Sequence, residues 1–274
     1  MIVFPNAKIN IGLNILRRRA DGYHDLETVM CPVPWRDVLE VVPSQSGHDT
    51  LVCSGRPVDC PPEKNLVMKA VKALRETVDF PAVDMYLEKI IPDGAGLGGG
   101  SADAAFAIRA VDSLFSLDLP KRVMAEVSSR IGADCPFFIY NEPSLCTGTG
   151  TTITHIPFRL PAGAWIAIVK PDVSVSTKEA YTGVKPCADV APLADTLASL
   201  PIENWQGTVC NGFEGSIFPQ HPEIASVKEE LLRQGAVYAS MSGSGAAVYG
   251  IFLNKALFKP LAEWNCYLFE EAGK

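Results

Sequence analysis

A glycine-rich segment, residues 92–105, constrains this chain most. It reads P-D-G-A-G-L-G-G-G-S-A-D-A-A, after an alternating stretch in which Val83, Met85 and Leu87 are apolar and before an alanine-rich stretch over residues 102–117. The alternation predicts a strand, and the alanine-rich stretch predicts a helix. Glycines permit tight turns that aim several N–H groups at one point, and a helix start adds partial positive charge there. The segment therefore predicts a binding loop for a polyphosphate.

Three kinds of glycine-containing turn compete for this segment. Gly94, Gly96 and Gly99 have the spacing of a dinucleotide-binding motif, but that motif needs a second strand ending in an acidic residue roughly 20 positions later. The sequence is still helical there, and a second amphipathic helix follows near residues 123–131. A P-loop closes with Gly-Lys-Ser/Thr, whereas residues 100–102 read Gly-Ser-Ala. A plain connecting turn needs only one or two glycines, so phosphate binding remains the favoured interpretation.

The strand predicted over residues 7–15 has two different faces. Isoleucine and leucine occupy the odd positions from 9 to 15, and the even positions from 8 to 14 hold Lys8, Asn10, Gly12 and Asn14. The apolar face predicts core. The polar face is either exposed to solvent or a surface that contacts a ligand. Glycine and asparagine are poor strand formers, which gives some weight to the ligand surface.

Asp134 is the third candidate, in the segment G-A-D-C-P-F-F. An aspartate before a proline-containing helix start is commonly an N-cap, and that interpretation stays open. The alternative is a catalytic carboxylate. A lysine on a strand, a phosphate loop and one aspartate behind a helix are the parts that a phosphoryl transferase acting on a hydroxyl group needs.

Three motifs resemble, in order, those of the GHMP small-molecule kinases. They are A-K-I-N at residues 7–10, G-A-G-L-G-G-G-S-A-D-A-A at 94–105 and M-S-G-S-G-A-A-V-Y-G-I-F at 241–252. Within that superfamily, three further segments resemble the 4-diphosphocytidyl-2-C-methyl-D-erythritol kinases of the non-mevalonate isoprenoid pathway. These segments are R-A-D-G-Y-H-D-L-E-T at 19–28, E-K-N-L-V-M-K-A at 63–70 and G-A-D-C-P-F-F at 132–138. The resemblance extends from residue 7 to residue 252.

The expected fold is α+β with two domains. The length of 274 residues exceeds what one core usually serves, and both halves of the chain mix strand and helix patterns. The segment P-F-R-L-P-A-G-A at 157–164 predicts a seam, which places an N-terminal domain at 1–157 and a C-terminal domain at 158–274. The resemblance implies a GHMP kinase fold, with a ribosomal-S5-like N-terminal domain and a ferredoxin-like C-terminal domain.

The resemblance also implies an activity and its residues. The implied reaction is ATP-dependent phosphorylation of the 2-hydroxyl of 4-diphosphocytidyl-2-C-methyl-D-erythritol, with ATP and Mg²⁺ as cofactors and a substrate that carries a cytidine diphosphate group. The implied catalytic residues are Lys8 and Asp134, and the implied substrate-binding residues are Asn10, Tyr23, His24 and Tyr181. The implied ATP-binding residues are Asn65, Pro92, Asp93, Gly94, Ala95, Gly96, Leu97, Gly98, Gly99, Gly100, Ser101 and Ala102.

Two positions of the glycine loop affect its chemistry. Ser101 offers a hydroxyl to Mg²⁺ or phosphate, and Ala102 stands where most members of the family have a second serine. Two other functions stay open at this point. One is a GHMP kinase for another small alcohol, such as homoserine or a sugar, which Tyr23 and His24 argue against because those substrates have no base. The other is a non-catalytic nucleotide-binding protein, which Lys8 and Asp134 argue against.

Bulk properties narrow the remaining classes. The net charge of −7 and the pI of about 5.2 disfavour binding to nucleic acid or to anionic membranes. Eight cysteines without a C-x-x-C pair indicate neither a zinc site nor a disulfide framework, and reduced thiols fit the cytoplasm. Strand-like sequence begins directly after Met1, so no signal peptide is expected. The charge-free stretch 235–254 predicts two strands around a Ser/Gly turn and not a membrane span. A monomer or weak homodimer is expected.

Overall fold

The computed structural model describes residues 1–58, 60–261 and 264–270. In it the chain divides into two units. Unit 1 comprises Met1–Lys8, Pro32–Asp93 and Gly98–Glu142, and unit 2 comprises Ile9–Cys31, Gly94–Leu97 and Pro143–Lys274. Each unit mixes helices with sheet, as expected for an α+β chain.

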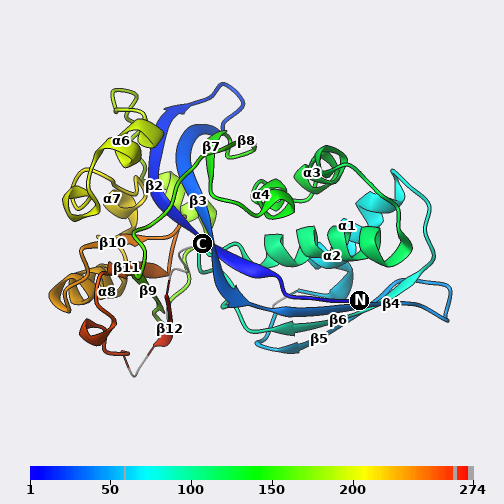
Figure 1. Cartoon of the computed structure of the whole chain (residues 1–274). Coiled ribbons are helices and arrows are strands. Elements are labelled where there is room, and N and C mark those ends of the chain that lie inside the picture. Colours follow the sequence, from blue (N-terminus) through cyan, green and yellow to red (C-terminus); the bar gives the residue numbers. More distant parts are fainter. Residues whose placement is uncertain (59, 262–263, 271–274) are drawn as a thin grey trace. The chain divides into compact units, whose positions relative to one another are not determined.

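Unit 1 is built on a four-stranded sheet with helices packed on it (Figure 1). The strands run in the order β1 (Ile2–Val3), β4 (Val38–Pro43), β6 (Val83–Lys89) and β5 (Thr50–Gly55). Strand β6 alternates as predicted, with Val83, Met85 and Leu87 buried beneath the helices. Helices α1 (Leu66–Arg75) and α2 (Gly99–Phe115) pack against each other, and a 3-10 turn, η1 (Pro62–Lys64), precedes α1.

Helix α2 begins at Gly99, three residues before the start predicted from the alanine-rich stretch. Gly98 precedes it in the left-handed region, with φ of 72°. The Gly-Gly-Ser sequence is a poor helix former, but it occupies the first turn, where packing decides the conformation more than propensity does. Helices α3 (Lys121–Ser129) and α4 (Cys135–Tyr140) follow, and both pack against α2.

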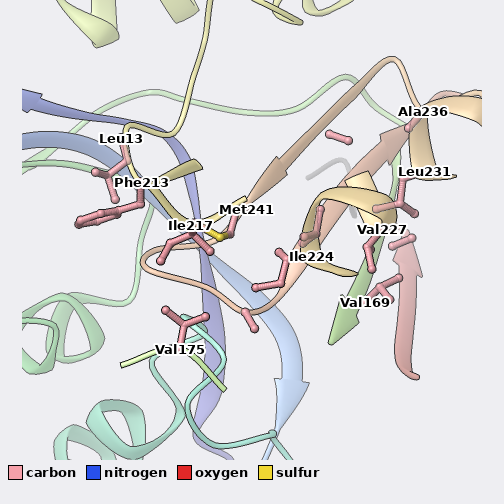
Figure 2. Packing of buried hydrophobic residues seen from close by; sticks show 14 of the residues in the cluster. Leu13, Val169, Val175, Phe213, Ile217, Ile224, Val227, Leu231, Ala236 and Met241 are labelled. Atoms are coloured by element: carbon pink, nitrogen blue, oxygen red, sulfur yellow. The ribbon is translucent and has the colours of Figure 1, made fainter. Parts of the chain in front are cut away.

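Unit 2 contains an antiparallel sheet in the order β10, β11, β9 and β12. These strands are β9 (Trp165–Lys170), β10 (Tyr238–Met241), β11 (Val248–Phe252) and β12 (Asn265–Glu270). In chain order the sheet reads 2-3-1-4, the strand order of a ferredoxin-like domain. Helix α8 (Pro222–Arg233) packs on β10 and β11, and Figure 2 shows Ile224, Val227 and Leu231 of this helix in the core with Val169 of β9.

A third sheet explains why the two units differ from the predicted domains 1–157 and 158–274. It joins β2 (Asn6–Arg18), β3 (His24–Arg36), β7 (Ser144–Gly148) and β8 (Thr152–His155) in that order. Strand β3 pairs with β7 through Leu26–Met30, so residues 9–31 belong to the same unit as residues 143–274. The predicted seam at 157–164 separates β8 from β9, but it lies inside unit 2.

The other short helices of unit 2 lie between β9 and β10. They are α5 (Thr177–Thr182), α6 (Leu193–Ser199), η2 (Ile202–Asn204) and α7 (Glu214–Ile217), and η3 (Lys255–Leu257) follows β11. The charge-free stretch 235–254 forms β10, a turn and β11, as predicted. Across the described ranges, no helix combines the length and the apolar character needed to cross a membrane.

Candidate functional site

Lys8 and Asp134 form an ion pair in unit 1. The Lys8 Nζ atom lies 3.5 Å from Asp134 Oδ2. Lys8 is 3% exposed, whereas the Asp134 side chain remains 31% exposed. Asn10, on the same face of β2, is 2% exposed, so the polar row of this strand is not a solvent face. A buried ammonium beside a partly open carboxylate is an arrangement suited to a reacting anionic group.

Asp134 stands at the N-cap position of α4 but does not cap it through its side chain. The Asp134 carboxylate accepts no capping hydrogen bond from the backbone N–H groups of α4, so it is not used for helix capping. The next residue, Cys135, is fully buried, and burial raises the pKa of its thiol to about 11, with the Ser101 hydroxyl acting in the opposite direction. The thiol therefore stays protonated at neutral pH, and Asp134 is the ionisable group that this segment presents.

The second half of the glycine loop opens helix α2 in unit 1. A Cβ atom at Gly98 would lie 2.9 Å from Phe138 Cζ and 3.3 Å from Lys8 Cε, so only glycine fits beside the lysine stem. Gly99, Gly100 and Ser101 form the first turn, whose N–H groups lack helical partners. These donors and the helix dipole make this helix start suitable for phosphate oxygens.

Ala102 and Ser101 differ in exposure. Ala102 is fully buried, whereas Ser101 is partly exposed. A hydroxyl at position 102 would need a buried partner, because an unpaired polar group in the interior is costly. The alanine therefore removes no solvent-facing hydroxyl from the loop, and Ser101 keeps the one hydroxyl that this turn presents.

The first half of the loop, residues 94–97, belongs to unit 2 and is held by the turn between β10 and β11. The Ser242 hydroxyl donates to the Gly96 carbonyl oxygen at 2.9 Å, and the Ala247 N–H donates to the Ala95 carbonyl oxygen at 3.1 Å. Gly94 and Gly96 both have positive φ, 58° and 71°. A Cβ atom at Gly96 would lie 2.0 Å from the Ser242 carbonyl oxygen, so this close backbone approach requires glycine.

Asn211 fixes that turn, and the sequence analysis did not identify it. Its side-chain amide donates to the carbonyl oxygens of Met241, at 2.7 Å, and Gly243, at 2.8 Å. The carboxylate of Glu214 accepts from the Met241 N–H at 2.9 Å. The available signal was an asparagine among apolar residues, in the segment T-V-C-N-G-F at 208–213. In the structure Asn211 is buried, with 3% exposed.

Asn10 is held from several sides within unit 2. Its Nδ2 group donates to Thr28 Oγ1 at 3.0 Å, and the Tyr249 hydroxyl donates to its carbonyl oxygen at 2.9 Å. The Ser242 hydroxyl lies 3.5 Å from Asn10 Oδ1. The amide is thus fixed in orientation, as a substrate-positioning group requires.

The predicted base-binding residues lie together in unit 2. The rings of His24 and Tyr181 stack, with centroids 4.8 Å apart and an interplanar angle of 18°. Tyr181 also makes an edge contact with Phe213, at 4.8 Å between centroids. Tyr23 is 68% exposed. The Tyr181 and Phe213 rings and the His24 imidazole are therefore in contact, and the exposed Tyr23 is the neighbour of His24 in the chain. In this structure His24 covers one face of the Tyr181 ring.

Helix α5, which carries Tyr181, is anchored at several points. The Ser176 hydroxyl caps it by accepting from the Glu179 N–H at 3.1 Å, and the Ser216 hydroxyl donates to the Ala180 carbonyl oxygen at 3.0 Å. His221 Nε2 lies 2.7 Å from Glu179 Oε1, and the hydrogen bond to Glu179 raises the pKa of His221. These contacts fix the position of helix α5 and therefore of Tyr181.

Asn65 caps helix α1. Its Oδ1 atom accepts from the Val67 N–H at 2.9 Å, and its Nδ2 group points to Cys53 Sγ at 3.9 Å. Beside it lies a pocket of about 300 Å³ whose lining includes Cys53, Arg56 and Pro62. The predicted contact of Asn65 with adenine stays a prediction, and so do the roles of Pro92 and Asp93, which lie in unit 1 directly before the loop.

Comparisons with known proteins identify the family of this chain. A family model described as the GHMP kinases N terminal domain matches residues 65–142, and one described as the GHMP kinases C terminal matches residues 198–263. The 4-diphosphocytidyl-2-C-methyl-D-erythritol kinases of Porphyromonas gingivalis and Parabacteroides distasonis are 45% and 46% identical to this chain, and each match covers 98% of both chains.

Solved structures show the same fold. The crystal structure of a 4-(cytidine 5'-diphospho)-2C-methyl-D-erythritol kinase is similar over 100% of both chains, with a TM-score of 0.79 and 28% identity. A homoserine kinase from Cytophaga hutchinsonii shares the fold at 17% identity, with a TM-score of 0.68. The fold is therefore the two-domain α+β fold of GHMP kinases, and the chain belongs to the 4-diphosphocytidyl-2-C-methyl-D-erythritol kinase family of that superfamily.

Proposed function

We propose that this chain transfers the γ-phosphoryl group of ATP to the 2-hydroxyl of 4-diphosphocytidyl-2-C-methyl-D-erythritol. The observation that carries the proposal is the buried Lys8 ammonium, 3.5 Å from the Asp134 carboxylate and packed through its stem against Gly98 at the start of α2. A cation, a carboxylate and unpaired helix N–H groups within one unit match the needs of phosphoryl transfer. Membership of the family supplies the identity of the alcohol.

The catalytic pair has distinct tasks in this proposal. The Asp134 carboxylate accepts a hydrogen bond from the substrate hydroxyl and, as the new P–O bond forms, receives its proton or orients it for release to water. The Lys8 ammonium stabilises the negative charge on the transferred phosphoryl group. The bond from the γ-phosphorus to the β,γ-bridging oxygen breaks, and ADP leaves with that oxygen.

The N–H groups at the start of α2 hold the ATP phosphates. Phosphoryl transfer depends mainly on alignment and charge neutralisation, so these fixed donors contribute without rearrangement. A bound Mg²⁺ ion would neutralise phosphate charge, with the Ser101 hydroxyl of this chain as a protein ligand. Among the described residues no group of three or more His, Cys, Asp or Glu side chains is arranged for a metal, which fits an ion held largely by phosphate oxygens and water.

The cytosine binds among Tyr23, His24 and Tyr181 in this proposal. The exposed Tyr23 ring and the Tyr181 ring offer faces for stacking, and a His24 ring nitrogen offers a hydrogen bond to the edge of the base. Asn10 positions the remainder of the substrate through its fixed amide.

The test is a substrate comparison. Purified protein is given ATP and Mg²⁺ with 4-diphosphocytidyl-2-C-methyl-D-erythritol, homoserine, mevalonate or galactose, and ADP release is measured. ADP formed only with the cytidyl substrate is the expected result. ADP formed with another alcohol would contradict the proposed base pocket but keep the kinase assignment, and ATP binding without turnover on any alcohol would contradict catalysis.

The setting of this activity follows from its chemistry. The enzyme is proposed to work in the cytoplasm, where ATP is plentiful and the eight free cysteines remain reduced. The expected state is a monomer or weak homodimer. Light scattering across a concentration series measures it directly, and a stable higher oligomer at low concentration would contradict the expectation.

A further inference from the structure

Lys89 is a buried cation that the proposed reaction does not use. It is the last residue of β6 and shares the inward phase of Val83, Met85 and Leu87. It is 6% exposed, and its ammonium contacts two carboxylates, those of Asp37 and Asp103. Burial lowers the pKa of Lys89, but the carboxylates of Asp103 and Asp37 together raise it by more, so the ammonium stays charged.

Asp37 ties this cation to the start of the glycine-rich segment. The residue lies between β3 and β4 and is fully buried. Its Oδ2 atom bonds Lys89, and its Oδ1 atom accepts from the N–H groups of Ile90, at 2.5 Å, and Ile91, at 2.8 Å. One carboxylate therefore fixes the backbone of the two residues that precede Pro92.

Asp103 ties the same cation to the helix that ends the glycine loop. It is the fifth residue of α2, and its Oδ2 atom accepts from Lys89 Nζ at 2.7 Å. Its Oδ1 atom is buried and has no hydrogen-bond partner among the residues that the structure describes. A Cβ atom at Gly99 would lie 3.1 Å from Ile91 Cγ2 and 3.4 Å from Lys89 Nζ, so the helix start lies directly against this group.

Burying the Lys89 ammonium between the Asp37 and Asp103 carboxyl groups is not expected to increase the stability of the fold. Desolvation of each ion costs several kcal/mol, and apolar residues of similar volume often serve as well or better. What the ammonium adds is a fixed geometry, because it must reach both carboxylates at once. One carboxylate, that of Asp37, binds the backbone just before the loop segment, and the other, that of Asp103, lies in the helix that ends it.

We propose that Asp37, Lys89 and Asp103 are positioning residues that clamp residues 90–91 to the first turns of α2 and so hold the glycine loop ready for the phosphates of ATP. The proposal rests on the proposed kinase function. We expect the clamp to act on nucleotide binding and not on the cytidyl substrate, since its hydrogen bonds and ion pairs join the end of β6, the residues before the loop and helix α2.

The test separates positioning from stability by removing the charges in pairs. Lys89→Met leaves two buried carboxylates without their cation and lowers the thermal unfolding midpoint. The double variant Lys89→Met/Asp103→Leu removes one of those carboxylates as well and recovers part of the midpoint, while the Asp37 carboxylate keeps its hydrogen bonds from the Ile90 and Ile91 N–H groups. In both variants we expect the KM for ATP to be about tenfold higher than in wild type. The KM for the cytidyl substrate should be unchanged.

Asp49→Asn is the matched control. The Asp49 carboxylate binds Arg75 and accepts from the Val83 N–H at 2.9 Å, so it anchors the other end of β6 in the same manner, away from the loop. Asp49→Asn should lower the unfolding midpoint and leave the KM for ATP unchanged.

Two measurements keep this inference separate from the kinase proposal. If wild-type protein releases no ADP, the kinase proposal fails, and calorimetric titration with ATP still compares the variants. A double variant that recovers part of its midpoint and binds ATP as tightly as wild type overturns the clamp. Equal loss of ATP affinity in Asp49→Asn also overturns it, because a general loss of stability would then explain the effect.

Discussion

Gly98 and Gly100, two residues apart in the glycine loop, should respond in opposite ways to alanine. Gly98 has φ of 72°, and a Cβ atom there would lie 2.9 Å and 3.0 Å from Phe138 ring carbons. Gly100 is helical, and its nearest contact would be Leu66 Cδ1 at 3.5 Å, an ordinary van der Waals distance. The chemical change is the same, so the difference isolates the backbone and the space around it.

The expected magnitudes follow from these two environments. At Gly98 the left-handed conformation and the overpacking against Phe138 together cost about 2–5 kcal/mol of unfolding free energy. At Gly100, within a helix, alanine should stabilise by up to about 1 kcal/mol. Gly98→Ala should also lower kcat, because the added methyl would lie 3.3 Å from Lys8 Cε and displace the ammonium.

Urea unfolding followed by circular dichroism measures both variants against wild type, and ADP release gives kcat. Equal loss of stability in Gly98→Ala and Gly100→Ala would refute the reasoning, since steric space and φ would then not decide the outcome. A Gly98→Ala variant with full stability and full kcat would refute the assigned close packing between the loop, Phe138 and Lys8.

Three further outcomes are expected. Asp134→Asn should lower kcat by at least about 100-fold and leave the KM for ATP near wild type, whereas Glu126→Gln on the exposed face of α3 should change neither; undiminished turnover in Asp134→Asn contradicts the mechanism. Tyr181→Ala should raise the KM for the cytidyl substrate by about tenfold, with Tyr181→Phe close to wild type, and equal effects of the two changes would remove stacking as the cause. Burial raises the pKa of Asp103 from 3.8 to about 7, so the folded state binds this proton more tightly and the stability it contributes is present below about pH 4 and lost as the pH rises through 7. The thermal midpoint of wild type relative to Asp103→Asn should therefore fall between about pH 4 and pH 7, and a constant difference would contradict the raised pKa.

The periodic parts of the chain were predictable from sequence because their burial is regular. Strand β2 covers the predicted residues 7–15, and the strands on either side of the turn near Gly243 appear as predicted. Helix α2 was predicted too late because its first turn is Gly-Gly-Ser, which propensity disfavours. Local sequence preferences predicted which helices and strands form. The first residue of α2 depends instead on packing against the rest of unit 1.

The candidate site was predictable only in part. Lys8, Asp134 and the glycine loop stand out as residue types in an expected order, but the role of the polar face of β2 depended on burial that only the fold reveals. Lys89 had a visible signal, because it continues the inward phase of β6. Its partners Asp37 and Asp103 are 52 and 14 residues away, and no local pattern pairs charges over such separations.

The proposed binding of cytosine against Tyr181 requires a change in the aromatic region of unit 2. The His24 and Tyr181 centroids are 4.8 Å apart, whereas a base inserted between two rings needs them roughly 7 Å apart, twice the contact distance of about 3.5 Å between carbon atoms. An aromatic pair contributes about 0.5–1.5 kcal/mol, and stacking of one base on an aromatic ring contributes about 1–3 kcal/mol. The base therefore compensates for the loss of the His24 contact. In the proposed complex the Tyr181 ring keeps its edge contact with Phe213, so we expect the His24 ring to move and to present a ring nitrogen to the polar edge of the cytosine.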